Sequence, residues 1–313
     1  MPSLIARFAS NIFWLGRYLE RAESLARIID TNKTYARDGA AGPDWERILN
    51  LYADQERFRK IYRKADEQSI LSFYVLDRDN PASILSNISY ARQNARSVRH
   101  LISTEMWTHL NIFYNQLSAM TLRNIWLSHL SQSCTEVKIG CQTFEGIAEG
   151  TFFRGEPWCF YQLGKYIERA DQTTRILDMG YDFIADEQGD AMRSVHWNVL
   201  LRSVSGYHAY RSRHPAISNP RDVAAFLLYD KEFPRAATLC VDQITRRVRE
   251  LEDRHGLQHR SRIEDSRRAL EFLLETGLGH HVTSPRLHDF LDALQSSLGR
   301  VSDALAVTYF GTG

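Results

Sequence analysis

The sequence contains one sixteen-residue pattern twice, as LGRYLERAESLARIID at residues 15–30 and as LGKYIERADQTTRILD at residues 163–178. In both stretches apolar residues recur every three or four positions, which predicts an amphipathic α-helix. A repeat of the apolar positions alone would indicate only that both helices are buried. The polar positions repeat as well, so we expect the charged face of each helix to serve a purpose common to both.

The rest of the chain has a helical period too. Glycine (17) and proline (8) are sparse among 313 residues, and no alternating run of strand length occurs. Asp66 and the pair Asn80-Pro81 look like helix starts. We therefore predict an all-α protein. The expected helices are 7–37, 44–63, 66–77, 82–102, 104–131, 132–148, 157–184, 189–211, 220–230, 234–255, 261–276 and 284–308.

A second pair of similar stretches follows in the same order. FYVLDRDNPAS at 73–83 aligns with FLLYDKEFPRA at 226–236, and the offset between matching residues changes only from 148 (168 minus 20) to 153 (234 minus 81). Two matches at nearly one offset predict an internal duplication. The expected repeats are residues 1–149 and 150–313. We expect them to form one compact multi-helix bundle around a pseudo-twofold axis.

Composition excludes several classes of protein. The formal net charge of +1 argues against a protein that mainly holds nucleic acid or an anionic membrane. Four cysteines without CxxC spacing favour reduced thiols. The sequence contains no run of about 18 apolar residues, and its first fifteen residues do not resemble a secretory signal. We expect a soluble, cytoplasmic protein.

The repeated helix has a polar arc opposite its apolar one. At about 100° per residue, Gly16, Glu20, Glu23 and Arg27 lie close together, as do Gly164, Glu168, Asp171 and Arg175 in the second copy. Glycine inside a helix costs about 1 kcal/mol relative to alanine. A Cβ at the glycine would therefore obstruct a close neighbouring helix or a ligand. Arg21 and Arg169 fall in the apolar arcs, where they must be paired or reach water.

Three interpretations of these residues remain open. They could form structural ion pairs, including i,i+4 pairs and cross-half pairs that fix register. They could instead line a central groove that binds a charged peptide or amino-acid-derived ligand. In the third interpretation, Glu20 and Glu168 act as acid-base or metal-binding carboxylates. The positions three residues after Glu20 and Glu168 hold Glu23 and Asp171 rather than the histidine that helical di-metal proteins use, so we predict neither a metal nor another cofactor.

These residues also carry a resemblance. FASNIFWLGRYLERAESLARIID and GTFFRGEPWCFYQLGKYIERADQTTRILD resemble the two signatures of the bacterial alpha-E family, and the likeness covers essentially the whole chain. The resemblance implies an all-helical fold, no established activity, and genomic neighbours that are ATP-grasp ligases and transglutaminase-like proteins. By motif position it places the family's Glu-Arg pairs on Glu20-Arg21 and Glu168-Arg169. Its preceding arginines fall on Arg7 and Arg154. Arg17 aligns with Lys165, where arginine is usual, and lysine cannot bind a carboxylate bidentately.

Weaker signals come from the histidines. His255 and His259 have metal-ligand spacing, but Gly256 between them favours surface side chains. His280 and His281, with His288 further on, are a weaker candidate metal site. The chain contains no Gly-rich phosphate loop, GxSxG or HExxH motif.

The leading functional hypothesis is a helical accessory protein, non-catalytic or co-catalytic, of a peptide-forming or peptide-modifying system. The resemblance implies an ATP-grasp amide ligase as its partner and a transglutaminase-like protein as a further candidate. An enzyme that uses Glu20 and Glu168 in the groove is the first alternative. The second is a structural dimerisation module with an exposed apolar face at residues 104–130.

Overall fold

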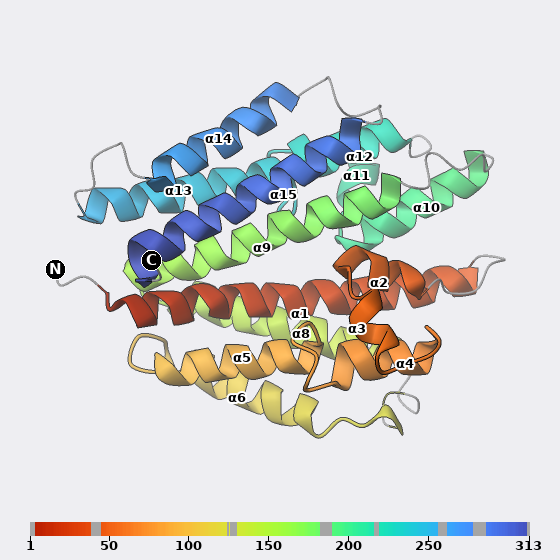
Figure 1. The fold of residues 1–313 in the computed structure, drawn as a ribbon, viewed down its shortest axis with the longest axis horizontal. Coiled ribbons are helices and arrows are strands. Elements are labelled where there is room, and N and C mark those ends of the chain that lie inside the picture. Colours follow the sequence, from red (N-terminus) through yellow and green to blue (C-terminus); the bar gives the residue numbers. More distant parts are fainter. Residues whose placement is uncertain are drawn as a thin grey trace. The chain divides into compact units, whose positions relative to one another are not determined.

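The computed structural model describes residues 4–38, 45–123, 125, 130–181, 190–215, 219–255, 262–277 and 286–311. Within these ranges the chain is helical and forms no strand, so the predicted all-α class is confirmed (Figure 1). Asp44, the expected start of a helix, lies outside the described residues. So do His259, His280 and His281.

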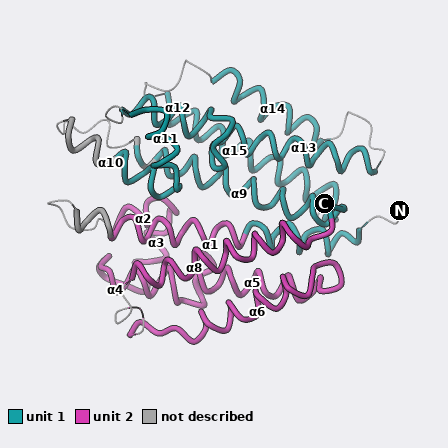
Figure 2. The backbone as a smooth tube through the Cα atoms, turned by 180° about the vertical axis from the view of Figure 1, so that it is seen from behind, with its two compact units in different colours: residues 1–17, 154–313 teal, residues 18–153 magenta. Residues whose placement is uncertain are grey.

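The chain divides into two compact units (Figure 2). Unit 1 combines residues 1–17 with residues 154–313, and unit 2 comprises residues 18–153. The helix α1 (Ala6–Asp38) contributes its first turns to unit 1 and the remainder to unit 2. The proposed repeats, 1–149 and 150–313, stay a prediction.

Unit 1 is organised around the long helix α9 (Glu156–Tyr181), on which helices from the second half of the chain pack (Figure 1). Leu163, Ile167 and Leu177 of α9 are fully or almost fully buried. The other elements of unit 1 are α10 (Asp190–Ser203), α11 (Tyr207–Arg213), α12 (Pro220–Tyr229), α13 (Ala237–His255), α14 (Arg262–Gly277), α15 (Arg286–Leu305) and the π-helical turn η2 (Ala306–Phe310).

In unit 2, helix α6 packs between α5 and α8. The apolar side of α6 is buried through Met106, Leu110, Phe113 and Leu117, and Ile112 alone among the large apolar residues of this helix is half exposed. The expectation of an exposed apolar face at 104–130 was therefore wrong for these four buried side chains. The elements of unit 2 after α1 are α2 (Glu46–Tyr52), α3 (Gln55–Arg59), α4 (Glu67–Leu71), the π-helical turn η1 (Ser72–Leu76), α5 (Ile84–Ser97), α6 (Thr104–Ser118) and α8 (Leu130–Thr151).

Several helix boundaries differ from the prediction. The expected helix 44–63 is broken at Ala53, and the expected helix 189–211 is broken at Ser205, because each residue has a left-handed backbone with φ of 53° and 59°. The expected helix 104–131 ends at Ser118. Asn80 does not cap α5; the Ser83 side chain does so by accepting a hydrogen bond from the Ser86 amide.

Asp66 does start α4, as predicted. Its side chain accepts a hydrogen bond from the Ser69 amide, and the Ser69 hydroxyl accepts one from the Asp66 amide, which completes a capping box.

The second pair of similar stretches adopts one local structure in both places. Asp77 and Asp230 each follow a helix with nearly identical backbone angles, φ −66°, ψ 120° and φ −68°, ψ 125°. Their Oδ1 atoms accept hydrogen bonds from the amides two residues on, at 2.9 Å for Asp79 and 2.8 Å for Glu232. These matching Asx turns account for the aspartate at the same position of both stretches. The duplication itself stays a prediction.

Among the described residues, no helix combines the length and apolar character needed to span a membrane. All four cysteines are buried and none forms a disulfide.

Candidate functional site

The two glycines of the repeated pattern lie where α1 and α9 cross within unit 1. A Cβ on Gly16 would lie 2.4 Å from the Tyr161 carbonyl oxygen, and a Cβ on Gly164 would lie 2.0 Å from that of Phe13. The contact is reciprocal, because Tyr161 precedes Gly164 by three residues just as Phe13 precedes Gly16. Of the two obstructions that the sequence suggested, a close neighbouring helix is therefore the one that the structure contains.

One charged residue of α1 in unit 1 pairs with the Glu-Arg motif of α9. The Arg17 Nε donates to the Glu168 Oε2 at 2.8 Å, and the Gln172 Nε2 donates to the Glu168 Oε1 at 3.1 Å. Glu168 is completely buried. Both of its oxygens therefore have partners. The guanidinium of Arg17 also lies 5.0 Å from the Trp14 ring centroid and contacts the Ser302 hydroxyl at 3.4 Å.

In unit 2, the first copy of the pattern is also largely buried. Glu20 is 5% exposed and Arg21 is half-buried. The Glu23 Oε1 accepts hydrogen bonds from the Arg27 Nη2 at 2.5 Å and from the Gln142 Nε2 of α8 at 3.1 Å. The predicted i,i+4 pair is thus present and is reinforced by a neighbouring helix.

The second copy has the corresponding i,i+4 pair on α9. The Arg175 Nε donates to the Asp171 Oδ2 at 2.8 Å. In the sequence, Lys165 and Arg169 flank Tyr166. Their charged groups lie 4.8 Å and 5.6 Å from the centroid of the Tyr166 ring. Cation–π contacts of this kind stabilise cations that are partly removed from water.

Each copy ends in an aspartate that pairs with another helix. Asp30 Oδ2 lies 2.6 Å from the Nζ of Lys138 in α8, and Asp178 Oδ1 lies 2.7 Å from the Nδ1 of His288 in α15. The hydrogen bond to Asp178, and then its charge, raise the pKa of His288 above its usual value of 6.5. The second copy therefore ends in a contact that depends on protonation, whereas the first ends in a lysine pair.

Two of the histidines considered as weak metal-site candidates, His288 and His255, lie in described parts of the structure. His288, Asp178 and Asp292 place possible ligand atoms within 4.8 Å of one another. Opposite ring nitrogens face the two carboxylates, however, with Nε2 3.6 Å from Asp292. This arrangement suits a protonated imidazole that bridges two carboxylates. His255 is not a simple surface residue, because its Nε2 lies 2.8 Å from the Glu156 Oε1.

Arg7 and Arg154, the two arginines that precede the motifs, are both exposed. The Arg154 guanidinium lies 3.6 Å from the centroid of Trp158, and that of Arg7 lies 5.5 Å from Phe8. Among the candidates from the sequence, the structure therefore places Gly16, Arg17, Gly164 and Glu168 together in unit 1.

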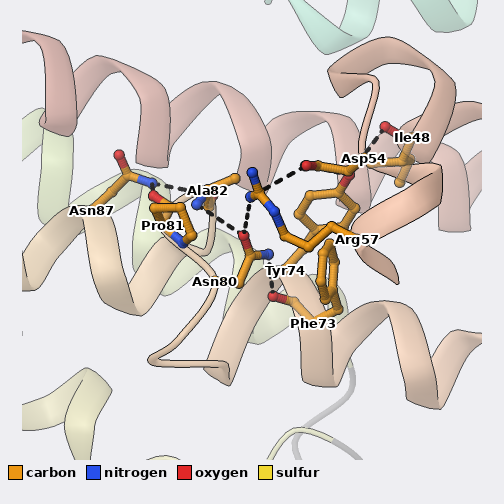
Figure 3. Close-up of polar contacts among 9 residues, drawn as sticks. All are labelled: Ile48, Asp54, Arg57, Phe73, Tyr74, Asn80, Pro81, Ala82 and Asn87. Carbon is orange, nitrogen blue, oxygen red and sulfur yellow. Dashed lines mark hydrogen bonds and ion pairs between the residues drawn. The ribbon is translucent and has the colours of Figure 1, made fainter. Parts of the chain in front are cut away.

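Unit 2 contains a separate polar cluster that sequence reasoning did not single out (Figure 3). Asp54 accepts a hydrogen bond from the Tyr74 hydroxyl at 3.1 Å and lies 3.3 Å from Arg57. Arg57 also donates to the Asn80 Oδ1 at 3.2 Å, and the Asn80 Nδ2 donates to the Phe73 carbonyl at 2.8 Å. Burial raises the pKa of Asp54, an effect that Arg57 partly offsets. This cluster ties α3 to the turn that holds Asp77.

Sequence reasoning missed the partners Gln172, Gln142, Ser302 and Lys138. Only the i+4 spacing of Glu168 and Gln172 could have signalled one of them, because the others are distant in the sequence.

Helices that cross at glycines and bury an arginine–glutamate pair define an all-helical protein. Gly16, Gly164, Arg17 and Glu168 of the repeated pattern make contacts within the fold. The chain belongs to the Alpha-E family, a predicted alpha-helical domain with a conserved ER motif, and the match covers residues 4–310. This confirms the resemblance that the sequence suggested.

Three relatives were compared, and all are uncharacterized. One protein from Mycobacterium bovis and two from strains of Mycobacterium tuberculosis are each 24% identical over 331 residues. The alignment covers 96% of this chain and 36% of each relative, so the chain spans about a third of their length. No solved structure matches this chain.

Proposed function

We propose that this protein is a helical accessory partner of a peptide-forming or peptide-modifying system, and that it acts with an ATP-grasp amide ligase. The observation that carries the proposal is the state of Glu168, which is completely buried with both oxygens engaged by Arg17 and Gln172. A general acid or base must be able to reach the proton that it transfers. A carboxylate held in this way favours a structural role for the motif.

The relatives support a protein that acts together with others. In each of them, the segment similar to this chain occupies 36% of the polypeptide, so an Alpha-E segment there is covalently joined to further sequence. A segment that stands beside further sequence in its relatives is expected to act together with other domains or proteins. The family resemblance supplies the candidate partners, the ATP-grasp ligase and the transglutaminase-like protein. The sequence lacks a nucleotide-binding motif, so ATP chemistry would come from the ligase.

The test is co-purification with the ATP-grasp ligase encoded in the native host, followed by measurement of ligase turnover with and without this protein. We expect a stable complex and a change in turnover. The transglutaminase-like protein is a second bait under the same conditions. Absence of a complex with either bait, together with unchanged turnover, would overturn the proposal.

Glu168→Gln distinguishes a structural motif from a catalytic one. In the accessory role, the variant loses stability and its effect on turnover follows the folded fraction. If the folded variant keeps its thermal midpoint but loses a catalytic activity, the enzyme interpretation is correct instead.

A further inference from the structure

The α5–α6 pair of unit 2 carries a row of arginines on its surface. Arg92 and Arg96 lie four residues apart on α5, and Arg99 follows three residues later in the turn after that helix. Arg92 and Arg96 lie one helical turn apart, about 6 Å at 1.5 Å per residue. Arg99 lies beyond the end of the helix, within 4.9 Å of the Trp107 ring that Arg92 also approaches. Arg96 and Arg99 are exposed, and Arg92 is half-buried. We call these three residues the arginine row.

Aromatic rings of α6 support two members of the arginine row. The Arg92 guanidinium lies 4.8 Å from the Tyr114 centroid and 5.7 Å from that of Trp107, and Arg99 lies 4.9 Å from Trp107. The Arg92 Nε also donates to the Asn111 Oδ1 at 2.8 Å. A guanidinium over a ring face keeps the outward N–H groups of its own plane available to an anion. Arg92 and Arg99 are thus held in place before any ligand binds.

The charge of the row is not balanced within the fold. Glu105 is the one acidic residue between positions 84 and 118, so the arginines give this segment a net charge of +2 (three minus one). Within the described part of the chain, Arg92, Arg96 and Arg99 form no ion pair, with Glu105 or with any other carboxylate. By contrast, Arg17, Arg27 and Arg175 all pair with carboxylates. The row is therefore a positively charged surface that is available to an anionic partner.

We propose that the arginine row is a docking surface for an acidic helical segment of a partner protein. Glutamates at i and i+4 of such a helix repeat the one-turn spacing of Arg92 and Arg96, and a third glutamate at i+7 extends the acidic face towards Arg99. Each glutamate can accept charge-assisted hydrogen bonds. A nucleic acid fits less well, because Trp107 and Tyr114 already carry guanidiniums and are not open platforms for bases. The overall charge of +1 also provides little attraction for a polyanion.

Fluorescence anisotropy tests the surface with the full chain. The probe is a labelled helix-forming peptide with glutamates at i, i+4 and i+7, and the same peptide with glutamines is the reference. We expect the glutamate peptide to bind more tightly, and its binding to weaken as salt is raised. Arg96→Glu/Arg99→Glu should reduce its affinity by about tenfold or more, because two charge-assisted contacts become repulsive.

The matched control is Arg59→Glu/Arg63→Glu. Both of these arginines are exposed in the same unit and lie outside the row, and the change in net charge is identical. We expect this control to keep at least most of the affinity. Circular dichroism establishes that each variant is folded, and Arg96→Gln/Arg99→Gln replaces the glutamate variant if that one does not fold.

Equal binding of the glutamine peptide, or equal loss of affinity in both double variants, would overturn the proposal. Tighter binding of an oligouridine of equal charge would overturn it too, and would identify the row as an RNA contact. These outcomes are independent of the ATP-grasp proposal, because a ligase could bind elsewhere on the chain while the arginine row binds no acidic helix.

Discussion

The two copies of the repeated pattern make the same contacts within their own helices but different contacts with the rest of the protein. Glu23–Arg27 in the first copy and Asp171–Arg175 in the second are equivalent i,i+4 pairs. In the first pair, Glu23 and Arg27 are only 8% and 12% exposed, and Glu23 also accepts a hydrogen bond from Gln142. In the second pair, Arg175 is 36% exposed. The terminal aspartates differ similarly, with lysine as one partner and histidine as the other. A local pattern therefore specifies the pair, and the surrounding helices determine what that pair contributes.

The largest expected effect comes from removing the buried carboxylate of the second copy. Glu168→Ala leaves Arg17 and Gln172 without their acceptor in a buried site, and we expect a loss of about 3–5 kcal/mol in the free energy of unfolding. Chemical denaturation measures this. The exposed Glu56→Ala, whose pair with Lys60 is at the surface, serves as the control and should change stability by less than about 0.5 kcal/mol. A small effect at Glu168 would mean that the ion pair is dispensable.

The reciprocal glycines come next. Gly164→Ala and Gly16→Ala each place a methyl group against a backbone carbonyl, so we expect each to destabilise the protein by about 3 kcal/mol. A Cβ on Gly299 of α15 would meet nothing within 4 Å. Gly299→Ala should therefore stabilise by about 0.5–1 kcal/mol through helix propensity alone. Thermal midpoints of the three variants show whether the signs differ as expected.

A smaller difference should separate the two i,i+4 pairs. Arg27→Ala removes the partner of a mostly buried carboxylate, and we expect about 2 kcal/mol of destabilisation. Arg175→Ala removes a more exposed side chain, with an expected loss of about 0.5 kcal/mol. Urea denaturation of both variants gives the comparison. Equal losses would show that the deeper burial of the first pair does not increase its contribution to stability.

The smallest effect concerns pH. The pKa of His288 is raised in the folded state, so its pairing contributes stability that is fully present below pH 6.5 and is lost as pH rises through the raised pKa. His288→Gln should therefore lower the thermal midpoint at pH 5.5 but not at pH 9. Lys138→Gln removes the equivalent partner of Asp30 and should have the same effect at both values, because lysine stays charged. If the loss in thermal midpoint depends on pH in the same way in both variants, the expected difference between the histidine and lysine contacts is wrong.

Much of the helical architecture could be predicted because it depends on local periodicity. The helix around Glu20, the helix around Glu168 and their i,i+4 pairs all follow from spacing within one segment. The breaks at Ala53 and Ser205 could not be predicted, because neither residue type normally adopts a left-handed backbone and the surrounding structure imposes it.

The residue that pairs with Glu168 could not be predicted from the sequence. The motif suggested a role for the adjacent Arg169, yet the guanidinium that pairs with Glu168 belongs to Arg17, 151 residues away. Pairings at that separation are set by how helices cross, which a single sequence does not specify. The two glycines did signal a close approach, because both copies of the pattern have glycine at the same interior position despite its cost in a helix.

The discontinuity of unit 1 has a consequence for synthesis on the ribosome. The segment that ends at Arg17 emerges first, but the helix that covers it begins only at Glu156. At about 5–20 residues per second, roughly 8–30 s pass before Glu168 is translated. During that interval residues 18–153 can fold as unit 2. The apolar side of the first turns of α1 stays uncovered, because α9 has not yet been made. Release of the chain before the second half is made would leave those turns exposed to chaperones and proteases.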